Sequence, residues 1–167
     1  SSPMKALIEK FSSAKHYANG LKIFSHKQEV FEPIWTAYMQ MLENGKLDRE
    51  LKELIRAKIA QNNDCSSYSE KTGNPDFPIL LEELNESTKK KLKEVSCYEI
   101  SVVLSRREKL ALKFAEKLGV EPESLDDHFF ESLREEFSDP EIVELGHVTA
   151  VGIGFERFLS VWEPRVC

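Results

Sequence analysis

The side chains best suited to chemistry lie in one stretch of the sequence, residues 53–72 (ELIRAKIAQNNDCSSYSEKT). The carboxylate of Glu53 stands twelve residues before the thiol of Cys65, and Tyr68 and Thr72 follow Cys65 at positions i+3 and i+7. A thiolate is a nucleophile and a redox group, and a carboxylate can relay protons or bind a polar ligand. The stretch therefore predicts a redox or acid/base site. The alternative is that Cys65 is a small apolar residue at a helix start and Glu53 is a surface residue.

Two helices would position these side chains. Residues 48–62 carry a stripe of large apolar residues and begin at a capping residue, Asp48. Because residues 62–64 (Asn-Asn-Asp) indicate a turn, a second helix over 65–72 can pack back antiparallel on the first. We expect Glu53 to be partly buried, since two alanines share its face and allow another helix to come close. At about 1.5 Å per residue, this geometry orders the side chains as a ladder: Glu53, Thr72, Tyr68 and Cys65.

Helical periodicity runs through nearly the whole chain, with Gly and Pro between the helical segments. Only residues 100–104 (ISVVL) have β character, and that run is short and isolated. We therefore expect an all-α fold, a single multi-helix domain over residues 1–167. The predicted helices span residues 4–18, 28–43, 48–62, 65–72, 77–84, 87–95, 105–118, 125–137 and 139–162.

The composition excludes several classes of protein. A net charge of −6 provides no basic field to attract phosphates, which argues against nucleic acid or an anionic membrane as a partner. Three irregularly spaced cysteines are too few for a secreted disulfide scaffold, so we expect a cytoplasmic protein. The longest apolar run, in residues 142–155, is interrupted by polar side chains and does not predict a membrane span.

A weak internal repeat relates two helices. DRELKEL (48–54) and DPEIVEL (139–145) share Asp, Glu, an aliphatic residue, Glu and Leu in register. This suggests a duplicated helical unit, although two independently capped helices would share the same residue types. The helix after Pro140 is apolar on nearly every side, so we expect it to be central.

Glu144 and His147 share a face of that helix, and His147 is either a second acid/base group or a core histidine. A di-iron site needs two Glu-x-x-His motifs plus further carboxylates. The chain has one such motif. We therefore expect neither a metal nor another cofactor.

Two separated blocks carry a resemblance to a known family. The block LDRELKELIRAKIAQNNDC (47–65) resembles the active-site helix of the carboxymuconolactone decarboxylase superfamily, which includes the alkylhydroperoxidase D-like proteins. The pattern there is Glu, eleven residues, then Cys-x-x-Cys-x-x-x-His. Residues 104–118 and 129–158 resemble later stretches of the same family in the same order. The resemblance covers about residues 28–162.

This resemblance implies an all-α fold, a homotrimer or homohexamer, and active sites near subunit interfaces. In the peroxidase branch the second Cys attacks peroxide, the first resolves it as a disulfide, and the Glu and His relay the proton. Glu53 and Cys65 match the family Glu and first Cys, while Tyr68 and Thr72 stand at the positions of the second Cys and the His. Tyr68 cannot close a disulfide, and Thr72 cannot exchange a proton near neutral pH, so the dithiol mechanism is unavailable.

Three hypotheses for the function remain, of which the first is preferred. In the first, a divergent family member uses the same pocket for acid/base chemistry or small-ligand binding. Glu53 would be the base or a polar anchor, and His147 a second acid/base group. Tyr68 and Thr72 would be hydrogen-bonding groups. In the second, Cys65 works as a one-cysteine hydroperoxide reductase. In the third, the chain is a non-catalytic oligomeric binding protein with a relic site.

Overall fold

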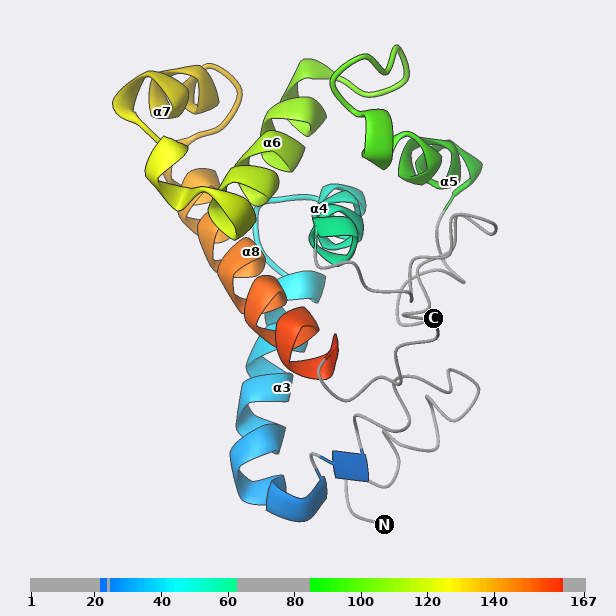
Figure 1. The fold of residues 1–167 in the computed structure, drawn as a ribbon, viewed down its shortest axis with the longest axis vertical. Helices are drawn as coiled ribbons and strands as arrows, with labels where there is room; N and C mark the ends of the chain where they lie inside the picture. The colour runs from blue at the N-terminus through cyan, green and yellow to red at the C-terminus, as the bar shows by residue number, and fades with distance from the viewer. Residues whose placement is uncertain (1–21, 24, 63–84, 161–167) are drawn as a thin grey trace.

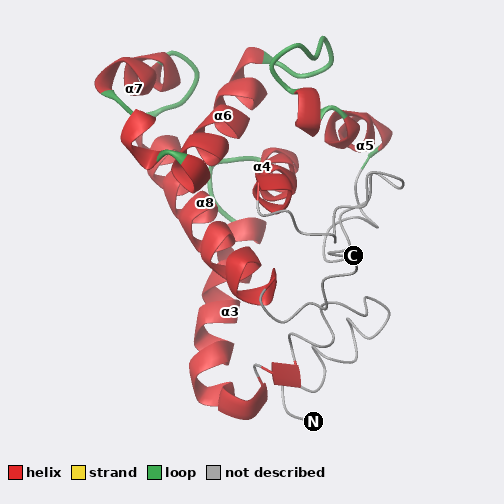
Figure 2. Ribbon diagram, in the orientation of Figure 1, coloured by secondary structure: helices red, strands yellow, loops and turns green. Residues whose placement is uncertain are grey.

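The computed structural model of the chain describes residues 22–23, 25–62 and 85–160. Within those ranges the chain is helical and contains no strand (Figure 2), which confirms the all-α class. The α-helices are α3 (Gln28–Glu43), α4 (Arg49–Asn62), α5 (Glu86–Lys93), α6 (Arg106–Val120), α7 (Asp127–Arg134) and α8 (Asp139–Ser160). Short 3-10 turns lie at Ser25–Lys27, Val95–Cys97 and Pro122–Ser124. No described helix combines the length and apolar character needed to cross a lipid bilayer.

Helix α4 occupies the centre of the described bundle. Figure 1 shows it nearly end-on, with α3, α5, α6 and α8 around it. Leu51, Ile55 and Ile59 face the larger apolar core, which also contains side chains of α3, α6, α7 and α8. Leu54 and Ala57 face a second core that α4 shares with α5 and α6. Because α4 has an apolar core on two sides, every residue from 51 to 60 is buried.

The expectation that the helix of residues 139–162 would be central is wrong. Helix α8 covers one side of α4, and its Val143 and Phe158 are exposed. An apolar composition raises the average burial of a helix but does not decide which helix is surrounded. Helix α4 takes the central place although four of its buried side chains are charged.

Side-chain caps fix where the helices begin, largely as the sequence predicts. Asp48 Oδ1 accepts a hydrogen bond from the Leu51 amide at 2.7 Å, so α4 starts there. Ser105 and Glu108 form a reciprocal capping box at the start of α6. The bounds of α3 match the predicted 28–43. The run at 100–104 forms turns and bends, because it is short and has no described strand to pair with.

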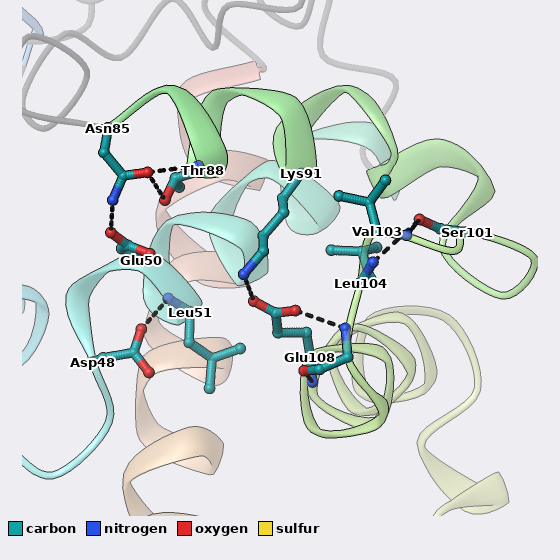
Figure 3. Close-up of polar contacts among 11 residues, drawn as sticks. Asp48, Glu50, Leu51, Asn85, Thr88, Lys91, Ser101, Val103, Leu104 and Glu108 are labelled. Atoms are coloured by element: carbon teal, nitrogen blue, oxygen red, sulfur yellow. Dashed lines mark hydrogen bonds and ion pairs between the residues drawn. The ribbon is translucent and has the colours of Figure 1, made fainter.

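Two polar contacts hold α5 against the neighbouring helices (Figure 3). The amide of Asn85, which caps α5, donates to the Glu50 carboxylate on α4. Lys91 Nζ donates to Glu108 Oε1 on α6 at 2.7 Å. The first contact joins α5 to α4 and the second joins α5 to α6, so both help to hold α5 over the face of α4 that lines the second core. The helices predicted at 4–18, 65–72 and 77–84 lie outside the described residues.

Candidate functional site

Glu53 lies on the buried face of α4 and is 0% exposed. The sequence predicts that Glu53 is partly buried, and it is completely buried, so the alternative of a surface residue is wrong. Both of its carboxylate oxygens accept hydrogen bonds from Arg56 Nη1, at 2.8 and 2.9 Å. Arg56 is 4% exposed, so both charges are out of water. Taking two charges out of water is costly, and a pair at this separation offsets that cost only in part.

Tyr38, on α3, presents its hydroxyl to this pair. Its ring lies among aromatic side chains, with the Phe155 ring centroid at 5.1 Å. Burial raises the pKa of Tyr38 to about 12, against the opposing effect of the Arg56 guanidinium. The carboxylates of Glu156 and Glu53 raise the pKa further, because they disfavour a phenolate beside them. The hydroxyl therefore keeps its proton at any physiological pH.

Helix α8 completes the cluster with two features. Glu156 is 7% exposed and is the third charged residue that acts on Tyr38. Gly152 stands one turn earlier, and a Cβ atom there would lie 2.9 Å from Ile59 Cδ1 and 3.6 Å from the Tyr38 hydroxyl. The absence of a side chain at Gly152 thus lets α8 approach α3 and α4. We call Tyr38, Glu53, Arg56 and Glu156 the buried polar cluster.

Two other buried cations of α4 have clear structural partners. Lys52 Nζ lies 2.6 Å from Glu144 Oε1 on α8 and donates to the Met41 and Asn44 carbonyls at the end of α3. Lys58 Nζ lies 2.6 Å from Glu116 Oε1 on α6. Each of these ion pairs joins two helices, whereas Glu53 and Arg56 belong to the same helix.

Tyr98 belongs with the second of these pairs. Its hydroxyl donates to Glu116 Oε2, and Lys58 Nζ lies 4.9 Å from the centroid of its ring. Burial, followed by the hydrogen bond to Glu116, raises the pKa of Tyr98. Tyr98 is thus a buried tyrosine whose hydroxyl is satisfied within the protein.

Of the other residues of the predicted site, the structure describes His147 alone. Cys65, Tyr68 and Thr72 lie outside the described residues, so the predicted ladder remains a prediction. His147 is exposed on α8, and its Nδ1 lies 2.8 Å from the Val143 carbonyl of the same helix. Glu156 lies nine positions after His147 on α8, which is roughly 13 Å along the axis. The alternative of a core histidine is wrong.

Sequence reasoning missed Arg56, Tyr38 and Glu156. In the sequence Arg56 looks like a solvated helix residue, and Glu156 lies on the same predicted helix as His147 but has no motif of its own. Tyr38 falls on the apolar stripe of α3 with Phe31, Trp35 and Leu42, where it looks like core. The signal that could have identified Tyr38 is its hydroxyl, because the oxygen of a buried tyrosine needs a hydrogen-bond partner.

Among the described residues, neither a metal-binding group nor the cleft on α6 involves this cluster. No group of three or more His, Cys, Asp or Glu side chains among them is arranged to hold a metal ion. A shallow cleft of about 270 Å³ lies on the outer face of α6, lined by Tyr98, Glu99, Arg106, Lys109, Leu110 and Lys113. It contains no residue of the buried polar cluster.

Comparison with known proteins gives a fold but no closer relationship. No model of a known protein family matches the sequence, and no curated protein matches it. One similar structure is a protein of unknown function from Agrobacterium tumefaciens, provisionally assigned as the antioxidant defence protein AhpD. It has a TM-score of 0.64 at 20% identity, over 84% of this chain and 92% of that one.

A second similar structure is the alkylhydroperoxidase AhpD core of an uncharacterized peroxidase-related protein from Ralstonia eutropha JMP134. Its TM-score is 0.63 at 20% identity, over 89% of this chain and 77% of that one. At this level of identity the likeness establishes the architecture. The chain has the all-α fold of the AhpD-like proteins, as the sequence resemblance implies.

Proposed function

We propose that this chain is a divergent AhpD-like protein that binds a small molecule, or performs acid/base chemistry on one, at a site built around Glu53. The AhpD-like fold supports this proposal. So does the sequence, in which Glu53 and Cys65 keep their spacing while Tyr68 and Thr72 replace the second thiol and the imidazole. The same replacements argue against a dithiol peroxidase.

The observation that carries the proposal is the complete burial of the Glu53–Arg56 pair within a single helix. Apolar residues of similar volume often replace a buried ion pair with no loss of stability. The two hydrogen bonds of this pair join residues of one helix, whereas Lys52–Glu144 and Lys58–Glu116 each join two helices. A role in binding or catalysis accounts for its presence better than a role in stability.

The geometry suggests how such a site would work. Arg56 Nη1 donates to both oxygens of Glu53 and so fixes the orientation of the carboxylate. Each oxygen has a second lone pair, with which it can accept a proton or a hydrogen bond from a ligand. Tyr68 and Thr72 would add polar contacts. The exposed position of His147 leaves Glu53 as the acid/base group of this proposal.

A double substitution tests the role of Glu53 apart from stability. Glu53→Leu with Arg56→Met removes both charges and keeps the volume, so the protein should remain folded. A library of small organic molecules is screened by thermal shift against this variant and the wild type. We expect compounds that raise the Tm of the wild type to lose their effect on the variant. Glu43→Gln, an exposed site on α3, serves as the matched control. Unchanged responses in the double variant would show the site to be a relic.

A one-cysteine hydroperoxide reductase is the second candidate. It is favoured by the assignments of the two similar structures to antioxidant defence and to peroxidase-related proteins. The Cys65 thiolate would attack the peroxide O–O bond, forming a sulfenic acid and releasing the alcohol. Two equivalents of an external thiol would then return Cys65 to the thiol, yielding water and a disulfide of the external thiol.

Hydroperoxide consumption with dithiothreitol tests this second candidate. The Cys65→Ser variant should be inactive, and the Cys97→Ser variant should match the wild type because Cys97 is an exposed free cysteine remote in sequence. Cys65 should also form a sulfenate that dimedone labels. Peroxide that persists in the presence of the wild type, with no labelled Cys65, would eliminate the candidate.

The assembly and location that we propose follow the family resemblance. We propose a homotrimer or homohexamer in the cytoplasm, with the site near a subunit interface. Light scattering coupled to size-exclusion chromatography gives the mass directly, and a monomer at micromolar concentration would contradict this part of the proposal.

A further inference from the structure

Helix α8 has an uncharged face that the described part of the chain leaves exposed. At about 100° per residue, Val143, Gly146, Ala150 and Gly154 fall within a sector of about 80°. Val143 is 60% exposed, Ala150 and Gly154 are exposed, and Gly146 is partly exposed. We call these four residues the outer face of α8. Uncharged surface that runs along a helix in this way favours contact with another helix.

The three glycines of α8 differ in what surrounds them. A Cβ atom at Gly152 would meet Ile59 Cδ1, so the approach of α4 accounts for that glycine. A Cβ atom at Gly146 or Gly154 would meet nothing within 4 Å beyond its own helix in the described part of the chain. Glycine is a poor helix former, so these two residues weaken α8 with no described contact in return. A second helix packed closely on the outer face would account for both.

We propose that the outer face of α8 binds the same face of a second copy of this chain, with the two helices antiparallel and crossing near Ala150. In a twofold contact the same patch serves on both copies, so it must be complementary to itself. The outer face meets this requirement, because Gly146 and Gly154 lie four residues on either side of Ala150. Each glycine would face the other glycine of the second copy, and the two backbones could approach closely.

The charges at the two ends of α8 favour this partner and this orientation. Asp139 in the first turn and Arg157 in the last lie in the same sector as the outer face. Asp139 has one printed partner on the surface, Arg134 at 3.4 Å, and Arg157 donates to the Gly119 carbonyl. Antiparallel copies bring the acidic start of each helix to the basic end of the other, and their helix dipoles oppose. A parallel contact would place like charges together.

This inference goes beyond the proposed function, because it concerns neither Glu53 nor a small ligand. It sharpens the proposed assembly. A twofold contact gives an even number of copies, so it fits a homohexamer and excludes a homotrimer. A measured trimer would leave the proposed assembly standing and overturn this inference, so the two can fail separately.

Ala150→Glu tests the contact, with Ser96→Glu as the matched control. Both positions are exposed in the described chain, so both variants should keep the helical circular dichroism of the wild type. In the twofold contact the two introduced carboxylates would repel each other at the crossing point. Light scattering coupled to size-exclusion chromatography should give an even number of copies for the wild type and Ser96→Glu, and half that mass for Ala150→Glu.

Three results of this experiment would overturn the inference. The first is a wild type with an odd number of copies, and the second is an Ala150→Glu variant with the mass of the wild type. The third is a monomeric wild type whose Tm falls on Ala150→Glu substitution. In that case another segment of the same chain covers the outer face.

Cross-linking tests the orientation without relying on a disruptive variant. The background has its cysteines replaced by serine at positions 65, 97 and 167, and must keep the wild-type mass. Ala150→Cys should cross-link to itself through a short bismaleimide, because the copies meet there. Val143→Cys should not, because antiparallel helices place its two copies about 20 Å apart along the axis. Self-cross-linking of Val143→Cys, or none of Ala150→Cys, would overturn the inference.

Discussion

Glu53 and Glu144 occupy equivalent positions in the internal repeat, yet they have different surroundings. Glu144, on α8, accepts hydrogen bonds from the amides of Lys46 and Leu47, at 2.7 and 3.2 Å, and lies 2.6 Å from Lys52 Nζ. It thereby ties α8 to α4 and to the loop that follows α3. Glu53 has one described partner, Arg56, on its own helix.

The difference indicates which of the two carboxylates the fold requires. Glu144 satisfies the backbone of a tight turn, in which Gly45 adopts φ 117° against the carboxylate. Its burial is therefore explained by structure. The described hydrogen bonds of Glu53 do not explain its burial in this way, because both come from Arg56 on its own helix. In this molecule a buried charge with several partners on other elements is structural, and one with a single local partner is the better candidate for function.

The largest effect on stability should come from breaking the Glu53–Arg56 pair on one side. Glu53→Ala leaves the Arg56 guanidinium buried without its carboxylate and should lower the free energy of unfolding by about 3–5 kcal/mol. Glu53→Leu/Arg56→Met should fall within about 1 kcal/mol of the wild type, because both charges are gone. Urea denaturation measures both values. A double variant as unstable as Glu53→Ala would make the pair a structural element like Glu144.

Glu144→Gln should have the next largest effect, about 2–3 kcal/mol, because Lys52 loses its buried counter-charge. Although burial opposes it, the hydrogen bonds from Lys52 and from the backbone lower the pKa of Glu144 below its ordinary value of 4.5. The stabilisation is therefore complete above that value and is lost as the pH falls through the lower pKa of the folded state. The difference between wild type and variant should be constant near neutral pH and shrink below about pH 4.5. A difference that grows on acidification would contradict this account.

Gly152→Ala should cost about 1 kcal/mol, because the new methyl group meets Ile59 Cδ1 and this outweighs the gain in helix propensity. Ile59→Val removes the opposing methyl group. A double-mutant cycle should therefore show that the two substitutions together cost less than the sum of their separate effects. Strict additivity would show that α8 and α4 are not in close contact at Gly152.

The smallest effect should follow His147→Gln, because the side chain is exposed and bonds to its own helix. The free energy of unfolding should change by less than about 0.5 kcal/mol. Any ligand response of the wild type should also persist. If His147→Gln keeps its stability but loses the ligand-induced rise in Tm, His147 belongs to the binding site, as the sequence hypothesis proposes.

Much of the fold could be predicted from the sequence, since local signals fix where helices start. Three of these signals predict helices close to their observed bounds: the cap at Asp48, the Ser105–Glu108 capping box and the apolar stripe of α3. The central helix could not be predicted, because two of the buried charges of α4, Lys52 and Lys58, form ion pairs with residues far away in sequence. A pattern of hydrophobicity contains no information on such pairs.

The candidate site was predicted only in part, for a related reason. The burial of Glu53 followed from the small residues that share its face. Arg56 and Tyr38 were missed because one looks solvated and the other looks like core when its helix is considered alone. Their significance depends on where α3 and α8 meet α4, which is a property of packing rather than of spacing.

The most direct test of the central claim is the ligand-induced rise in Tm, compared between Glu53→Leu/Arg56→Met and Glu144→Gln. Each variant is measured with the compounds that stabilise the wild type, relative to its own unliganded Tm. If Glu53 serves function and Glu144 serves structure, the double variant loses the response while Glu144→Gln keeps it, despite being the less stable protein. A double variant that responds as the wild type does, or a wild type that responds to no compound, would contradict the account.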